Sequence, residues 1–185
     1  MSKIFLNIDT GDFIIESKVL SYDNYSLLEE YRGEIQELSG FLVIVNDKIL
    51  LVKPKKFKGI SHKWSIPKGK VENGNKFDTA LKELKEETGI KLPKSIKNKT
   101  EKLKIYYKKS GKLKELTTYI ININEDELNI DIDNKWEVSK KHLDKDEIYK
   151  AKFFTMEEAM DKLELGQLPL IRMIKKENKH NVRYN

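Results

Sequence analysis

The stretch WSIPKGKVENGNKFDTALKELKEETGI, residues 64–90, decides the fold of this chain. Its pattern predicts a short strand over Trp64–Ile66 that ends at Pro67, then an irregular, glycine-containing loop over Lys68–Gly74. An amphipathic helix follows over Phe77–Thr88, and Gly89 stands where a left-handed cap is wanted. Glycines let the loop fold back on itself and turn backbone carbonyls and amides toward a metal ion or a phosphate.

The predicted helix separates an acidic face from an apolar one. At 100° per residue, Glu83, Glu86 and Glu87 share about 100° of arc. The apolar side occupies a separate arc, formed by Phe77, Ala80, Leu81, Leu84 and Thr88. Like charges four residues apart cost an isolated helix about 0.2–0.5 kcal/mol per pair, so such a cluster is favourable only around a cation. Oxygen ligands without histidine or cysteine suit Mg²⁺ or Mn²⁺ better than zinc. The plainer interpretation is a solvated face, because glutamate is a good helix former.

This strand, loop and helix together resemble the Nudix hydrolase family, whose motif is G-x5-E-x7-R-E-U-x-E-E-x-G-U, with U a bulky apolar residue. Residues 83–90 match its second half without a break, and Gly69 matches its opening. Asn75 stands where the family has glutamate, and Lys82 where it has arginine. Six residues rather than seven separate these two positions. The resemblance extends over about residues 40–175.

The resemblance implies an α/β (α+β) fold, a Nudix-type α/β/α sandwich with a mixed β-sheet. We expect three parts: an N-terminal extension over 1–38 with a β-hairpin and a short helix, the Nudix hydrolase domain over 39–176, and a polar tail over 177–185. The elements expected outside residues 64–90 are strands over Ile4–Ile8 and Phe13–Leu20, a helix over Asn24–Leu38, hairpins over 40–53 and 103–123, a strand over Glu147–Phe154, and helices over Met156–Leu163 and Leu168–Lys176.

The family's chemistry is the hydrolysis of a nucleoside diphosphate linked to another group, with Mg²⁺ or Mn²⁺ as cofactor. Carried over by the motif, Glu83, Glu86 and Glu87 would be catalytic residues and metal ligands, helped by a backbone carbonyl at Lys68 or Gly69. Divalent cations neutralise the phosphate oxygens and lower the pKa of bound water. Glu83 and the distant Glu147 are the two candidates for the general base; the plainer interpretation of Glu147 is an exposed acid at a strand edge. The departures Asn75 and Lys82 predict slower turnover or a higher metal requirement.

The sequence Pro67-Lys68-Gly69 resembles Nudix members that act on dinucleoside polyphosphates, inositol pyrophosphates or RNA 5′ ends. Lys63 and Lys68 are therefore predicted to bind substrate, and neighbouring lysines would extend a cationic loop: Lys55, Lys56 and Lys58. Plain solvated lysine is the competing interpretation. Three tyrosines and one histidine are further candidates for substrate contacts, although packing or a surface position is commoner for such residues: Tyr106, Tyr107, Tyr119 and His62.

Composition limits the function classes. The chain has 185 residues and no cysteine, which fits one main domain and excludes disulfide scaffolds, thiolate zinc sites and thiol nucleophiles. We expect a cytoplasmic protein, because the sequence shows no signal peptide and no membrane-spanning run. Only three of the 36 basic residues are arginines, so the net charge of +6 indicates tolerance of polyanions rather than base reading.

The expected partner is a nucleotide or polyphosphate substrate, most specifically a dinucleoside polyphosphate. Two alternatives stay open: an RNA 5′-end pyrophosphohydrolase or decapping enzyme, for which RNA is the partner, and a catalytically weak Nudix-like nucleotide-binding module. The oligomeric state, a dimer included, and the role of residues 1–38 also stay open.

Overall fold

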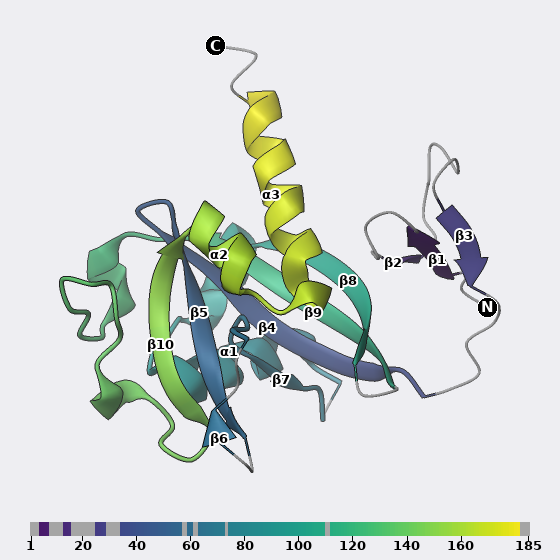
Figure 1. Ribbon diagram of the computed structural model, residues 1–185. Helices are drawn as coiled ribbons and strands as arrows, with labels where there is room; N and C mark the ends of the chain where they lie inside the picture. The colour runs from purple at the N-terminus through teal and green to yellow at the C-terminus, as the bar shows by residue number, and fades with distance from the viewer. Residues whose placement is uncertain are drawn as a thin grey trace.

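In the computed structural model (Figure 1), the described residues are 4–7, 13–15, 25–28, 34–56, 59–60, 63–72, 74–109 and 112–181. The strands are β1 Ile4–Asn7, β2 Phe13–Ile15, β3 Tyr25–Leu28, β4 Gln36–Val45, β5 Lys48–Lys56, β6 Gly59–Ile60, β7 Lys68–Lys70, β8 Glu101–Lys109, β9 Lys112–Asn122 and β10 Ile148–Thr155. The helices are α1 Lys76–Thr88, α2 Met156–Lys162 and α3 Leu168–Asn181, with 3₁₀ turns η1 Lys94–Lys99, η2 Glu125–Leu128, η3 Lys140–His142 and η4 Leu165–Gln167.

The strands form one mixed sheet in the order β10-β5-β4-β9-β8-β2-β1-β3, with β6 beside β5 and β7 beside β4. β4 and β9 run parallel, whereas β5, β7, β8 and β10 pair antiparallel with their neighbours. The middle of β4, from Leu38 to Val43, is a nearly continuous apolar run buried throughout, as expected for a strand covered on both faces. The predicted mixed sheet is confirmed.

Helices cover the two faces of this sheet and give it a core on each side (Figure 1). On one face α1 packs Phe77, Ala80 and Leu84 against alternate residues of β4, β5 and β9. On the other face α2 and α3 pack Ala159 and Leu170 against the intervening strand residues. The predicted α/β/α sandwich is therefore confirmed. Both cores follow from the period-2 alternation of side chains along a strand.

α1 begins and ends where its sequence predicts, to within one residue. Asn75 is the N-cap, because its side-chain oxygen accepts a hydrogen bond from the backbone N–H of Asp78 at 3.1 Å. Gly89 has a φ of 79°, and its N–H donates to the carbonyl of Lys85 at 2.8 Å. A side chain at Gly89 would also collide with His142, so glycine is required there for space as well as for conformation.

Strand pairing overturns two expectations outside α1. The segment Asn24–Leu38, expected to be a helix, contains β3 and the start of β4 instead. The backbone groups of β3 form hydrogen bonds with β1, and this pairing outweighs the helical spacing of the leucines. Residues 29–33 lie outside the described residues. The loop expected over Lys68–Gly74 begins as a strand, β7, because its first three residues pair with β4.

The short strand expected over Trp64–Ile66 is wrong as well: Trp64 and Ser65 form only isolated bridges, to Leu163 and Val52. The remaining expected elements are confirmed within a few residues at each end. The N-terminal hairpin is present as β1 paired with β2, although its turn and the predicted extension to Leu20 lie outside the described residues. The hairpins over 40–53 and 103–123 are β4–β5 and β8–β9. β10, α2 and α3 account for the C-terminal part. The boundaries expected at residues 38 and 176 stay predictions.

Candidate active site

The loop glycine and the first helical glutamate meet at the edge between β7 and α1. β7 is held by antiparallel pairing with β4, in which Gly69 lies opposite Ser39. A Cβ atom on Gly69 would overlap the carboxylate of Glu83. The backbone of β7 therefore approaches Glu83 as closely as only a glycine permits. The structure thus brings together two of the predicted metal-ligating residues, Gly69 and Glu83.

Glu87 lies deeper, under the same strand. Its side chain is only 8% exposed, and its carboxylate accepts a hydrogen bond from the backbone N–H of Lys68 at 3.1 Å. Burial raises the pKa of Glu87 to about 8, and the nearby charge of Lys68 only partly opposes the effect. Such a carboxylate lacks sufficient positive charge around it. On the helical projection Glu87 is the acid nearest the apolar arc, which explains its burial.

The other acids differ in exposure. Glu83 is half-buried, and burial together with the charge of Glu86 raises its pKa. The Glu86 side chain is 49% exposed, and its Oε2 lies 3.9 Å from the ammonium of Lys82. Two solvent-exposed groups at this separation interact weakly. The acidic face of α1 thus runs from a buried acid at Glu87 to a solvated one at Glu86.

Glu147 reaches this cluster from the far end of the sequence. It immediately precedes β10, and its carbonyl accepts a hydrogen bond from the N–H of Lys55 at 2.7 Å. The side chain is exposed, and its negative charge contributes to raising the pKa of both Glu83 and Glu87. All four glutamates predicted to be catalytic therefore gather in one region of the described structure.

This region fits a hard divalent cation in its donor chemistry. Its side chains offer only oxygen, and burial raises the pKa of Glu83 and Glu87 more than the nearby lysines lower it. Each carboxylate has a different neighbour: Glu83 lies against Gly69, Glu86 lies near Lys82, and Glu87 accepts a hydrogen bond from the N–H of Lys68. Among the described residues, no three histidine, cysteine or acidic side chains converge closely enough to enclose an ion as they stand.

Cationic side chains lie on the other side of Lys68. Burial lowers the pKa of Lys68, and the charges of Lys109 and Lys114 lower it further, against the opposing effect of Glu87 and Glu164. Burial and Lys109 likewise lower the pKa of Lys114. Glu164 lies among these lysines, and its carboxylate is 2.5 Å from the ammonium of Lys109. Lys68 thus links the acidic cluster, through its N–H, to a group of lysines.

The structure also shows where the other residues predicted to bind substrate lie. Lys63 is exposed beside Trp64. The ammonium of Lys55 donates to the carbonyl of Lys145, next to Glu147. Three tyrosines are buried and act mainly in packing, as their plainer interpretation predicts: Tyr106, Tyr107 and Tyr119. The remaining candidates, His62, Lys58 and the side chain of Lys56, lie outside the described part of the chain.

The two departures from the motif border one hollow. It has a volume of about 200 Å³ and is lined by Lys70, Glu72, Asn75, Asp78, Thr79, Lys82 and Glu83. Asn75 supplies the helix cap instead of a charge, and Lys82 reaches only toward Glu86. The space between these two side chains is therefore open beside Glu83.

Comparison with known proteins identifies the family. The NUDIX domain pattern matches residues 38–174, which is most of the chain. The chain belongs to the Nudix family. A Nudix hydrolase from Nitrosomonas europaea is similar in fold, with a TM-score of 0.55 and 20% identity over 80% of this chain and 90% of that one. The expectation of a Nudix-type pyrophosphohydrolase is thereby confirmed at the level of the family.

Two further solved structures share the Nudix fold. An Ap4A hydrolase from C. elegans, in a binary complex, has a TM-score of 0.57 and 21% identity over 79% of this chain and 99% of that one. A bifunctional NMN adenylyltransferase/ADP ribose pyrophosphatase from Francisella tularensis, complexed with AMP and Mn ion, has a TM-score of 0.59 and 21% identity over 78% of this chain and 42% of that one. Among curated protein sequences, none matches this one.

Two features of the described structure were not predicted from the sequence: the buried partners of Glu115 and the group of lysines around Lys68. Glu115 is a charged residue inside the buried run of β9, and such a residue indicates a buried partner. Lys109 at the end of β8, Lys114 on β9 and Glu164 before η4 come near Lys68 only through the tertiary structure, which no local pattern reveals.

No helix among the described residues is long and apolar enough to cross a membrane.

Proposed function

We propose that this Nudix protein is a Mg²⁺- or Mn²⁺-dependent hydrolase that cleaves a pyrophosphate bond in a polyphosphorylated nucleotide, most specifically a dinucleoside polyphosphate. The observation that carries the proposal is the gathering of carboxylates beside β7, where Gly69 closely approaches the Glu83 carboxylate and the N–H of Lys68 donates to Glu87. Buried charges in proteins are normally paired or bound to metal. Divalent cations are the partner that this donor set fits.

In this proposal Glu83, Glu86 and Glu87 hold the metal, with a backbone carbonyl of β7. When bound, the cation neutralises phosphate oxygens and lowers the pKa of an attacking water. Glu87 enters this role by losing the proton that burial favours, so its deprotonation and cation binding are coupled. The close approach of Gly69 keeps the backbone of β7 beside Glu83.

The general base is Glu83 or Glu147. Glu83 has a raised pKa, which suits a proton acceptor, but a metal ligand is less free to act as a base. Glu147 is exposed and lies close enough for its charge to act on both buried acids. Replacement of each by glutamine distinguishes them: loss of the base flattens the acidic limb of the kcat profile, whereas loss of a ligand raises the metal concentration required.

The lysine group around Lys68 supports a substrate with several phosphates. Burial lowers the pKa of Lys68 and Lys114, and repulsion from Lys109 lowers both further, although Glu164 opposes the shift at both lysines and Glu87 opposes it at Lys68. A phosphate chain that extends from the carboxylates toward Lys109 and Lys114 would relieve this repulsion. The likeness to an Ap4A hydrolase is consistent with a dinucleoside polyphosphate, and the likeness to an ADP ribose pyrophosphatase leaves shorter diphosphates to be tested.

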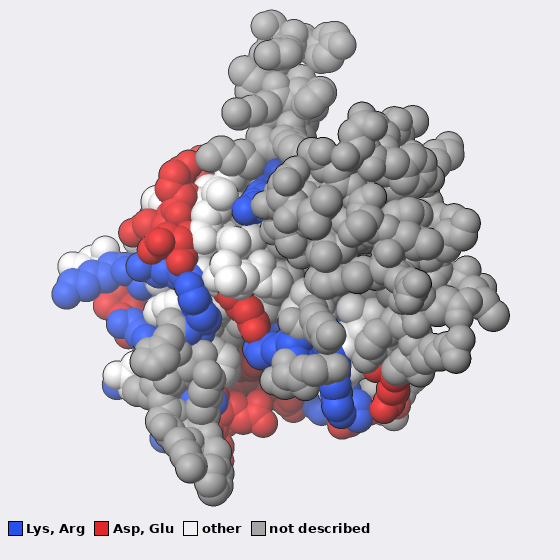
Figure 2. Space-filling view, turned by 45° about the vertical axis from the view of Figure 1, so that its right-hand side comes forward, with Lys and Arg blue, Asp and Glu red and all other residues white. Residues whose placement is uncertain are grey.

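An RNA 5′ end and a non-catalytic binding module remain the alternatives predicted from the sequence. Among the described residues on the face that Figure 2 draws, Lys and Arg side chains lie next to Asp and Glu side chains. Within the lysine-rich stretch, Lys104 pairs with Glu115 and Lys109 with Glu164. These pairs favour a small polyphosphate over a long nucleic acid. A cytoplasmic location likewise stays a prediction from composition.

A nucleotide panel with Mg²⁺ or Mn²⁺ tests the proposal. We expect hydrolysis by the native chain and a loss of about a thousandfold in kcat/KM for Glu86→Gln, because a metal ligand contributes several kcal/mol. Glu86 is exposed, so the variant should fold. Glu101→Gln, an exposed acid on β8, is the matched control and should keep full activity. Undiminished hydrolysis by Glu86→Gln would refute the ligand assignment, and no hydrolysis by the native chain would favour the binding module.

A further inference from the structure

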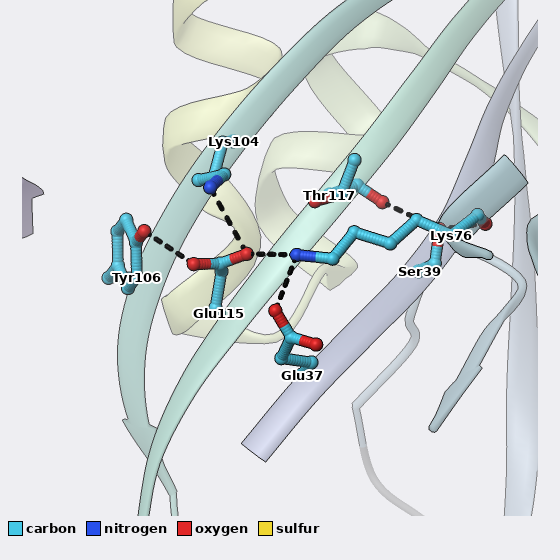
Figure 3. A network of polar contacts seen from close by, with 7 residues as sticks. All are labelled: Glu37, Ser39, Lys76, Lys104, Tyr106, Glu115 and Thr117. Carbon is cyan, nitrogen blue, oxygen red and sulfur yellow. Dashed lines mark hydrogen bonds and ion pairs between the residues drawn. The ribbon is translucent and has the colours of Figure 1, made fainter. Parts of the chain in front are cut away.

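A network of charges surrounds the first residue of α1, away from the catalytic glutamates (Figure 3). The ammonium of Lys76 lies 2.6 Å from Glu37 Oε1 and 2.5 Å from Glu115 Oε1. Glu115 also accepts a hydrogen bond from the Tyr106 hydroxyl at 2.6 Å and pairs with Lys104 at 3.2 Å. The carboxylate of Glu115 is thus fully partnered although its side chain is only 11% exposed.

The sheet accounts for the position of Lys76. Glu37 on β4 and Glu115 on β9 lie directly opposite each other in the parallel register. Two like charges in such a pair repel each other. Figure 3 shows the Lys76 side chain extending from α1 across the strands, with its ammonium between the two carboxylates. Because the ammonium of Lys76 lies between these two acids, they fix where α1 begins.

The backbone of Lys76 is fixed as well. The hydroxyl of Ser39, which is fully buried on β4, donates to the Lys76 carbonyl at 2.6 Å. Ser39 is also the residue opposite Gly69 in the pairing of β4 with β7. One position on β4 thus holds both the first turn of α1 and the loop glycine that contacts Glu83.

Helix geometry connects this anchor to the catalytic face. Lys76 and Glu83 are seven residues apart, which is about 20° short of two full turns and about 10 Å along the axis. They therefore lie on the same side of α1. A rotation of the helix about its axis that removes Lys76 from its acids would move the Glu83 carboxylate away from Gly69 by the same angle.

We propose that Lys76 is a positioning residue that sets the rotation of α1 about its axis and its position along that axis, so that Glu83 meets Gly69 in the geometry required for cation binding. The inference rests on the proposed function. Lys76 and its two acids fix the rotation of the helix about its axis.

Binding of Mn²⁺ to the protein without nucleotide, followed by electron paramagnetic resonance, tests this inference. We expect Lys76→Met to weaken Mn²⁺ binding about tenfold, as removal of a residue that orients metal ligands typically does. Lys76→Arg, which keeps the charge, should restore most of the affinity. The KM for nucleotide at saturating Mn²⁺ should change little, because the lysine group around Lys68 remains.

Lys150→Met is the control for lost stability. Lys150 pairs with Glu137 at 2.5 Å and is similarly half-buried, but it lies on β10 rather than α1. It should lower the melting temperature and keep native Mn²⁺ affinity. Should Lys76→Met fail to fold, Ser39→Ala replaces it, since that variant removes only the hydroxyl that binds the Lys76 carbonyl and should weaken Mn²⁺ binding by a smaller factor.

Two results would overturn the inference, and they are distinguishable. If the native chain binds Mn²⁺ and Lys76→Met and Ser39→Ala bind it equally tightly, Lys76 has no positioning role and the proposed function stands. If the native chain binds no Mn²⁺ under any condition, the proposed function fails and the inference fails with it.

Discussion

The two ends of helix α1 handle buried acids in opposite ways. At the first turn, burial would raise the pKa of Glu115, but hydrogen bonds from Lys76, Tyr106 and Lys104 outweigh it and leave the pKa below its ordinary value. About three turns further along the helix, burial raises the pKa of Glu87 to about 8, and the neighbouring Lys68 opposes this shift only in part. The same residue type thus has a lowered pKa at one end of the helix and a raised pKa at the other.

This difference separates a structural role from a functional one. Lys76, Lys104 and Tyr106 compensate the negative charge of the Glu115 carboxylate. Its role is therefore structural: it holds β4, β9 and α1 together. At Glu83 and Glu87, burial raises the pKa and the nearby lysines oppose it only in part. Clustered acids with raised pKa values are typical of functional sites, which is consistent with the proposed metal site.

Replacing each acid by glutamine should change stability in opposite directions. Glu115→Gln leaves Lys104 without its acidic partner and Lys76 with Glu37 alone, and we expect it to lower the free energy of unfolding by about 3 kcal/mol. Glu87→Gln removes an unfavourable buried charge, and we expect a gain of about 1 kcal/mol at high pH without divalent cations. Urea unfolding in the presence of a chelator measures both. If both variants are destabilised equally, the contrast between the two ends is wrong.

The pH dependence of stability should also differ between the two acids. Between about pH 4.5 and about pH 8 the folded protein keeps a proton on Glu87 that the unfolded chain releases, so this group makes stability fall as pH rises through that window. Glu115 has a lowered pKa, so its contribution is present above the ordinary pKa of a glutamate and is lost as pH falls through the lowered value.

Thermal unfolding with chelator across this range, native chain against Glu87→Gln, isolates the effect of Glu87. The difference between them should grow with pH up to about pH 8 and then level off. Saturating Mg²⁺ should abolish the fall in native stability, because the cation stabilises the charged carboxylate. A difference that is constant with pH would mean that Glu87 is not protonated in the folded protein.

The lysine group offers a test on the substrate side of the same comparison. We expect Lys68→Met to raise KM about tenfold for a dinucleoside tetraphosphate, since an interaction with a charged group contributes about 1.5–3 kcal/mol. The effect on ADP-ribose should be smaller, because a diphosphate extends less far from the carboxylates. Lys91→Met, an exposed lysine beyond the end of α1, is the control. An equal rise for both substrates would contradict binding of an extended phosphate chain.

The smallest expected effect concerns the hollow between Asn75 and Lys82. Lys82→Arg places a planar, bidentate donor beside Glu83 and Glu86, where the lysine ammonium only reaches 3.9 Å from Glu86. We expect activity per bound metal to rise about threefold, less than the factor of ten that 1.4 kcal/mol would give. Activity that does not rise would show that the lysine does not limit this site.

The sequence predicted the elements whose signals are local. Residues 64–90 contain the cap, the helical period and the terminating glycine of α1, so that helix was predicted to within one residue. The helix expected over Asn24–Leu38 failed because Tyr25–Leu28 pairs with β1, a non-local contact that helical leucine spacing does not reveal. The same limit applies to the site: the motif marks Glu83 and Glu87, whereas Lys109, Glu164 and Glu115 acquire their partners only through the sheet.

The most direct measurement is calorimetric titration of the chelator-treated protein with Mg²⁺ or Mn²⁺, with and without a non-hydrolysable dinucleoside polyphosphate. We predict saturable binding by the native chain and by Glu101→Gln, with release of protons near neutral pH as Glu87 becomes charged. Glu83→Gln and Glu87→Gln should lose most of this binding. Absence of uptake of either ion by the native chain, with or without nucleotide, would contradict the assignment of the carboxylates on α1 to a metal site.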